Sequence, residues 1–259
     1  MQISRKKART AFREPTRTAR LDRWYRSQLL KVVDNIIGIT TSIEETDPII
    51  YSAKVQAALN AYSGVLHDWA VDVSAKMIQE ASDIDFAVWM AVGKKISRAT
   101  RKLLKESGTS DVFKALQQEQ VTLIKSLPLE ASQKVHGWTK EGLSKGERFE
   151  DIAKRIQSEI GIVTENRAIL IARTETARAR TNFTQARARN VGSPGYIWHT
   201  VGDGRVRPLH ARLDGTYHDW NDPPVCDIGK GGMPLRSHPG AIFNCRCWPS
   251  PVWPEENQE

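Results

Sequence analysis

Two short sequences near the C-terminus, DGRVRPLHARLDG (203–215) and NCRC (244–247), decide how this chain folds. All three cysteines and four of the six histidines lie between residue 195 and residue 259. Glycine and proline recur throughout the same region, which indicates loops held by specific contacts rather than long regular elements. We therefore expect a compact, loop-rich C-terminal module that differs in kind from the chain before it.

The start of this module carries turn and strand signals. Gly192-Ser193-Pro194-Gly195 is the clearest linker signal in the chain. Alternation from Tyr196 to Val201 predicts a short strand, and Gly202-Asp203-Gly204 predicts a turn that leads into Arg205-Val206-Arg207. The module is therefore expected to contain short strands.

Zinc prefers nitrogen and sulfur ligands, and the module offers them from Cys226, His238, Cys245 and Cys247, with His210 and His218 as further candidates. A bound metal would stabilise a loop-rich region whose hydrophobic core is small. If a metal is bound, we expect the ligands to be Cys245, Cys247, His238 and His210. However, Cys-x-Cys is tighter than the usual zinc-finger spacing, so buried, unligated thiols with hydrogen-bonded histidines are the alternative. An odd number of cysteines argues against a disulfide framework.

Apolar residues recur at steps of three and four from about Asp47 to Phe183, which is typical of packed helices. The first three stripes predict helices over 51–77, 84–103 and 110–128, the last one ending at Pro128. Pro48 suits the first turn of a helix. These stripes are ordinary core seams, so no chemistry is assigned to them.

After Pro128 we expect a shorter helix and then a break at residues 143–146. Another helix begins near Phe149 and stops at Gly161, and Thr164 caps the next one. This last helix carries six arginines, which predict a solvated face with an internal pair between Glu175 and Arg178. Nucleic-acid contact by this face is the second interpretation.

These patterns predict an α+β fold, with predominantly helical N-terminal and central regions and a small, loop-rich α+β module at the C-terminus. We expect four consecutive segments. They are a basic N-terminal arm (1–46), a helical N-terminal region (47–127), a central helical segment (128–192) and the module with the Cys/His cluster (193–259).

The basic arm carries the whole excess charge of the chain. Residues 1–31 contain ten Lys or Arg against Glu14 and Asp22, and ten minus two equals the formal net charge of +8. Such an arm suits a polyanion or an acidic protein surface, and a solvated tail is the alternative. The candidate contacts with nucleic acid or an acidic protein surface are Arg5, Lys6, Lys7, Arg9, Arg13, Arg17 and Arg20.

Several protein classes are disfavoured by the sequence. No apolar run reaches the length of a membrane span, and the basic start lacks the features of a secretory signal. We therefore expect a soluble protein made in the cytoplasm, with no membrane span.

The common catalytic motifs are absent from the sequence, so we do not expect an enzyme. The alternative is a metal-independent nuclease, or another nucleic-acid-processing enzyme, that uses His210, His218 and Arg205. A cysteine nucleophile could also be drawn from Cys245 with His238. Neither arrangement is required by the spacing.

Ordered motifs over about residues 130–250 resemble the phage Mu F-like head morphogenesis family, a group of minor head proteins that includes the minor head protein of phage SPP1. The resemblance rests on an arginine-rich helix, the two C-terminal sequences quoted above, the Pro223-Pro224 loop and His238-Pro239. The residues that match these motifs are Arg173, Glu175, Trp198, Asp203, Arg205, Asp214 and Gly215.

The resemblance implies a virion protein of the phage head, present in few copies near the portal and active in procapsid assembly, DNA packaging or ejection. It implies the portal protein as a partner, together with the major capsid or scaffolding protein and phage DNA. On this reading the helical region 47–127 attaches to the portal or capsid, and the basic residues of the arm contact DNA or the portal. Some relatives place a cysteine where this chain has His210, a change that keeps metal-binding capacity.

Overall fold

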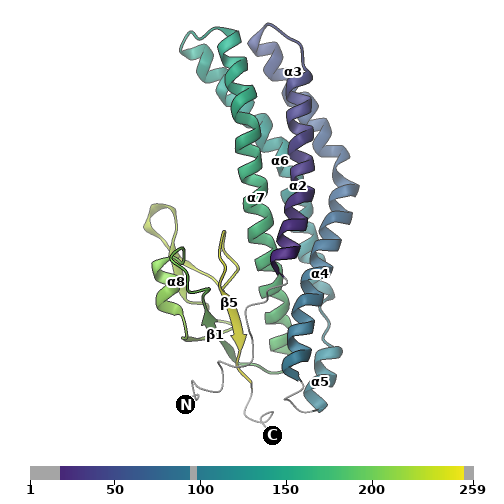
Figure 1. Ribbon diagram of the computed structural model, residues 1–259, viewed down its shortest axis with the longest axis vertical. Helices are drawn as coiled ribbons and strands as arrows, with labels where there is room; N and C mark the ends of the chain where they lie inside the picture. Colours follow the sequence, from purple (N-terminus) through teal and green to yellow (C-terminus); the bar gives the residue numbers. More distant parts are fainter. Residues whose placement is uncertain (1–17, 94–97, 254–259) are drawn as a thin grey trace. The chain divides into compact units, whose positions relative to one another are not determined.

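The computed structural model describes residues 18–93 and 98–253 (Figure 1). The chain divides into two compact units. The first unit combines Met1–Leu21, Met77–Leu116 and Arg173–Glu259, and the second combines Asp22–Lys76 and Gln117–Ala172. Among the described residues, no helix is both long enough and apolar enough to cross a bilayer.

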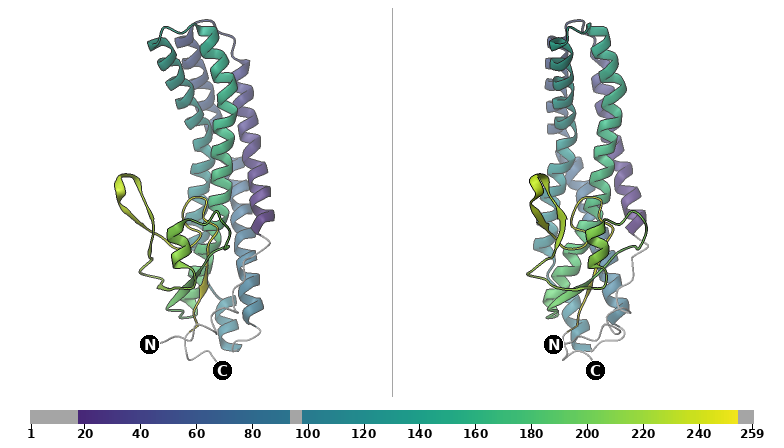
Figure 2. Two further views of the ribbon diagram at one scale, coloured as in Figure 1. Left: turned by 60° about the vertical axis from the view of Figure 1, so that its left-hand side comes forward. Right: turned by 90° about the vertical axis from the view of Figure 1, so that its left-hand side faces the viewer.

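The second unit is helical. It is built from parts of α2 (Thr18–Ser42), α4 (His67–Gly93), α6 (Ser110–Ser144) and α7 (Phe149–Asn190), together with α3 (Pro48–Val65). Within this unit the helices run side by side (Figures 1 and 2). Its core consists mainly of fully buried aliphatic side chains, such as Leu29, Ile36, Val55, Leu59 and Ile156. The α3 helix begins as expected, because Pro48 lies in its first turn and Asp47 accepts hydrogen bonds from the backbone N–H groups of Ile49 and Ile50.

Helix α2 changes the interpretation of the basic arm. Residues 18–42 are a helix that buries Leu29 and Ile36, and the Tyr25 hydroxyl donates a 2.9 Å hydrogen bond to Gln120 Oε1. This half of the predicted arm is therefore part of the helical body, because its apolar residues recur at helical spacing and find a core. Arg20 lies exposed near the start of α2. The other candidate contacts, Arg5, Lys6, Lys7, Arg9, Arg13 and Arg17, lie outside the described residues.

Two predicted helix ends are wrong. Pro128 lies inside α6, although proline removes a backbone hydrogen bond and costs about 3 kcal/mol or more in a helix interior. Buried residues on both sides of it, from Ile124 to Val135, favour a continuous helix. Gly161 and Thr164 likewise lie inside α7, where a Cβ on Gly161 would be 3.1 Å from Ile37 Cδ1. The glycine therefore allows a close approach of α2, and the Thr164 hydroxyl donates to the carbonyl of Ile160 instead of capping a helix.

The predicted helix over 51–77 is two helices, because α3 ends at Val65 and α4 begins at His67. The predicted helix over 84–103 is likewise divided between α4 and α5 (Arg98–Lys105). The break after α6 is confirmed, with Gly146 at a positive φ of 70°. Helices α2, α4, α6 and α7 each contain residues of both units, so each unit is assembled from separate stretches of the chain.

The C-terminal part of the first unit is the predicted α+β module. Strand β1 (Gly195–His199) lies between β2 (Tyr217–Asp219) and β5 (Trp248–Pro251) in an antiparallel sheet. The register pairs Tyr196 with His218 on one side and with Pro251 on the other. A second sheet pairs β3 (Val225–Ile228) with β4 (Pro234–Arg236), and α8 (Pro208–Leu213) and a 3-10 turn, η1 (Lys230–Gly232), complete the module. The predicted α+β fold class is confirmed.

The core of the first unit mixes aromatic, aliphatic and cysteine side chains. Trp89 of α4, Ala188 of α7 and the β1 residues Tyr196 and Trp198 pack in one cluster with all three cysteines. The same unit also buries an ion pair, in which Arg187 of α7 donates to Asp85 of α4. Arg187 therefore departs from the solvated face predicted for the α7 arginines. The predicted pair is present, with Arg178 Nη1 3.6 Å from Glu175 Oε2.

Candidate metal centre in the C-terminal module

His210 is positioned by the short helix α8. Pro208 begins this helix, and the backbone reverses after it at Gly215, where φ is 75° and the N–H donates a 2.8 Å hydrogen bond to the Trp198 carbonyl. The His210 ring meets the Trp198 ring edge-on, with 5.3 Å between the ring centroids. Helix α8 and strand β1 together fix the direction of the imidazole.

Cys245 and Cys247 lie in the loop before β5, and two threonines of α7 hold this region. Asn244, at a positive φ of 54°, donates from its backbone N–H to Thr174 Oγ1 at 3.1 Å. Thr181 donates from its hydroxyl to the Pro239 carbonyl at 2.7 Å. The backbone of the NCRC sequence is therefore held from the same helix that leads into the module.

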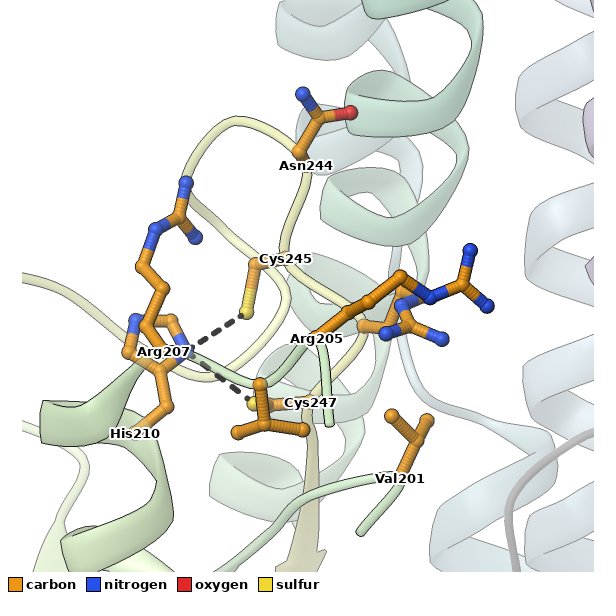
Figure 3. Close-up of a pocket in the computed structure, with 9 residues that line it drawn as sticks. Val201, Arg205, Arg207, His210, Asn244, Cys245 and Cys247 are labelled. Carbon is orange, nitrogen blue, oxygen red and sulfur yellow. Dashed lines mark hydrogen bonds between the residues drawn. The ribbon is translucent and has the colours of Figure 1, made fainter. Parts of the chain in front are cut away.

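The structure brings His210, Cys245 and Cys247 together. His210 Nδ1 lies 3.3 Å from Cys247 Sγ and 3.5 Å from Cys245 Sγ. All three residues are buried, and their potential ligand atoms lie within 4.8 Å of one another. In Figure 3 the imidazole is directed at both sulfur atoms. The arrangement supplies two soft sulfur ligands and one nitrogen ligand at a single point.

The two thiols affect each other strongly. The hydrogen bond from Cys247 lowers the pKa of Cys245 to about 4, with further contributions from His210 and from the Gly240 backbone N–H, 3.3 Å from the sulfur. Conversely, the neighbouring Cys245 sulfur raises the pKa of Cys247, and burial adds to this shift. One negative charge is therefore favoured on this pair, at Cys245.

The other ring nitrogen of His210 is unusual. Among the described residues, His210 Nε2 is a buried polar atom without a hydrogen-bond partner. Only 2% of the His210 residue is exposed. An unpaired buried polar group costs about 1 to 3 kcal/mol, so the position of this ring calls for a compensating interaction.

His238 does not lie with the other three predicted ligands. Its Nδ1 lies 3.0 Å from the Tyr196 hydroxyl oxygen, and its Nε2 lies 3.3 Å from Gln185 Nε2. Burial lowers the pKa of His238 to about 4, which favours the neutral ring. Both nitrogens thus already have polar neighbours, and the histidine contributes to the packing of β1 against α7.

The remaining cysteine and histidine candidates are also separate. Cys226 is buried in the core and its thiol donates to the Leu235 carbonyl at 3.5 Å. Burial raises the pKa of Cys226 to about 11. His218 Nε2 lies 2.7 Å from the Thr216 hydroxyl oxygen. The proposed nuclease set is therefore dispersed, since His210 and Arg205 line a common pocket whose lining, within the described ranges, does not include His218.

This pocket, of about 170 Å³, is lined by the three clustered residues and by arginines. Arg205, Arg207 and Arg246 contribute to its walls. Arg246 donates two 2.6 Å hydrogen bonds to the Asp203 carboxylate and holds the pKa of Asp203 at about 2. Arg207 Nε lies 3.2 Å from Asp227 Oδ2. Arg205 Nη2 lies 3.6 Å from Asp203 Oδ2, so the pocket is polar and each of its three arginines has an acidic partner.

The other motif residues hold loops in place. Asp214 accepts a 2.8 Å hydrogen bond from the Thr200 backbone N–H, and Asp203 accepts one of 3.1 Å from that of Arg205. On α7, Glu175 is buried and Arg173 is exposed. The sequence interpretation did not identify Thr174 and Thr181, because each acts through a partner that is distant in the sequence. It also missed Gly240, whose backbone N–H donates to the Cys245 sulfur five residues later.

The comparisons with known proteins agree with the region that contains this site. Residues 133–249 match the family model described as Phage Mu protein F like protein. The chain is also 34% identical, over 144 residues, to an uncharacterized protein of Haemophilus influenzae. That alignment covers 56% of this chain but 30% of the relative, so the two proteins differ in extent. No solved structure is significantly similar to the chain.

The family match begins within α6, continues through α7 and includes His210, Cys245 and Cys247. It also includes every motif residue on which the resemblance rested, from Arg173 to Gly215. Over residues 133–249, this chain is therefore similar to the phage Mu protein F like family.

Proposed function

We propose that this protein is a minor head protein that acts at the portal during phage head assembly. The observation that carries the proposal is the family match over residues 133–249, which implies a phage head-related protein. The portal is the expected partner within the head, with the major capsid or scaffolding protein as a further contact.

The roles of the motif residues support attachment rather than turnover. Asp203, Asp214 and Gly215 each stabilise a loop by hydrogen bonds or by backbone conformation. Residues used in this way produce a rigid surface on a small module, which is what a protein needs in order to bind a partner with little loss of conformational freedom.

The charge distribution supports an anionic contact. Ten Lys or Arg residues against two acidic residues over residues 1–31 suit either packaged DNA or an acidic portal surface. Both contacts would weaken steeply with salt, and only the DNA contact would be lost after nuclease treatment.

The test uses the phage or prophage that encodes the chain. We expect mass spectrometry of purified heads to detect the protein in far fewer copies than the major capsid protein, and affinity purification to recover it with the portal ring. A variant with Gln in place of Arg5, Lys6, Lys7, Arg9, Arg13, Arg17 and Arg20 should lose salt-sensitive binding, whereas Lys31→Gln, a single exposed change on α2, should not. Absence of the protein from heads would overturn the proposal.

The His210→Ala variant separates this proposal from the nuclease alternative. A head protein should lose assembly or stability, with no cleavage activity to lose. A nucleic-acid cleavage activity in the native protein that disappears in a folded His210→Ala variant would instead establish an enzyme.

A further inference from the structure

We propose that His210, Cys245 and Cys247 form a zinc site with three protein ligands and one exchangeable position that faces the adjoining pocket. The site joins α8 to the loop before β5, and its histidine and first cysteine are 35 positions apart in the sequence. It goes beyond the proposed function, because attachment to the head does not itself require a metal.

The distances fit tetrahedral zinc. Zn–S bonds of about 2.3 Å and Zn–N bonds of about 2.0 Å place nitrogen and sulfur ligand atoms about 3.5 Å apart in a tetrahedron. The observed separations from His210 Nδ1 to the two sulfur atoms are 3.3 and 3.5 Å. Metal binding would therefore require little rearrangement of these side chains.

Burial and chemistry point to the same ion. Exposure is 2% for His210, 2% for Cys245 and 7% for Cys247. Two thiolates and an imidazole are soft and borderline ligands, which select zinc over magnesium or calcium.

The fourth position distinguishes this site from a closed structural one. Within the described ranges, the group of residues able to hold a metal contains these three and no fourth member. The same three residues line the pocket together with Arg205, Arg207 and Arg246. Sites with three protein ligands keep their last position for water or another small ligand. Here that ligand would be exchangeable and would lie among guanidinium groups.

The first experiment measures metal in the full-length protein. Purification without chelator should yield about one equivalent of zinc, and less than about half an equivalent after loading with zinc sulfate would overturn the proposal. Cys245→Ser, Cys247→Ser and His210→Ala should each lose the metal. The matched controls Cys226→Ala and His238→Gln should retain it, and loss of zinc from His238→Gln would mean that the ligand set is wrong.

The second experiment needs no variant, so it does not depend on whether a variant folds. Cobalt(II) titrated into metal-free protein should give thiolate-to-cobalt absorption and tetrahedral d–d bands that saturate at about one equivalent. Addition of azide should shift the d–d bands if the fourth position is exchangeable. Saturated cobalt spectra that azide leaves unchanged would contradict the exchangeable position.

Alkylation of thiols supplies a further readout. Cys245 and Cys247 should resist iodoacetamide in the zinc-loaded protein and react after treatment with chelator, whereas Cys226 should remain protected in both states. A protein mass lower by two hydrogens, with no zinc, would indicate a disulfide between Cys245 and Cys247 and would overturn the proposal.

Discussion

Each of the two units of this protein is stabilised internally by a different kind of interaction. In the second unit, helices bury aliphatic side chains such as Leu29 of α2 and Val55 and Leu59 of α3. The first unit also buries polar and reactive groups, including the Asp85–Arg187 pair and the Cys/His cluster. Apolar periodicity is therefore sufficient to build a helical core, whereas a small module depends on a few specific contacts that other residue types cannot replace.

The largest expected effect is at the buried ion pair of the first unit. Burial raises the pKa of Asp85, and Arg187 opposes this shift. The Asp85→Ala variant should lower the free energy of unfolding by about 3 to 5 kcal/mol, because it leaves a buried charge without its partner. Urea denaturation followed by circular dichroism would measure this change. The double variant Asp85→Leu/Arg187→Met should lose much less, and an equal loss would show that the charge is not the cause.

The second unit should respond to loss of volume instead. Leu59 of α3 is fully buried, so Leu59→Ala should cost about 2 to 5 kcal/mol through lost burial and a residual cavity. The control Leu129→Ala, at a position that is 38% exposed, should cost under about 1 kcal/mol. Denaturation curves of the two variants provide the test, and similar losses would contradict the assignment of Leu59 to the core.

A smaller effect is expected at the turn that supports the cysteines. Gly240 has a φ of 82°, and a Cβ there would lie 2.7 Å from Thr181 Oγ1. The Gly240→Ala variant should cost about 1 to 3 kcal/mol through backbone strain and steric conflict. Gly202 also has a positive φ, of 70°, but a Cβ there would meet no other atom. Gly202→Ala therefore introduces backbone strain without steric conflict and should cost less. Thermal denaturation would rank the two variants.

The smallest effect should come from the exposed contact of Asp203 with Arg246. Arg246 holds the pKa of Asp203 at about 2, below its ordinary value of 3.8. The contact therefore stabilises the fold above pH 3.8, and its contribution is lost as the pH falls from 3.8 toward 2. Asp203→Asn should reduce this acid dependence slightly, as seen in denaturation midpoints across that pH range. Added salt should weaken the contact, since exposed charges are screened.

Local signals predicted the fold where local interactions are sufficient. Asp47 and Pro48 correctly marked the start of a helix, and the break near Gly146 and the strand at Tyr196 were also correct. Local signals failed at Pro128 and Gly161, because packing on both sides of these residues outweighs their cost within a helix. They failed at α2 for the related reason that a basic, partly apolar segment becomes a core helix once partners cover its apolar face.

For the candidate site, three of the four predicted ligands come together, and His238 has other polar neighbours. The sequence spacing could not show which of His238 and His210 lies beside the two cysteines, since both histidines are near turns. Only the positions of α8 and β1 distinguish them, because they direct one imidazole toward the sulfur atoms and leave the other against Tyr196.

The amino-acid sequence by itself determined the helical character of most of the chain, the loop-rich module after residue 192 and the family that residues 133–249 resemble. These properties follow from periodicity, turn residues and ordered motifs, which are local or linear. Tertiary structure decided that α2 joins the helical core, that Asp85 and Arg187 are buried together and that His210 meets Cys245 and Cys247. Each of these contacts joins residues that are far apart in the sequence. The free energy of each contact depends on the distance between its two partners, which is set only when the chain is folded.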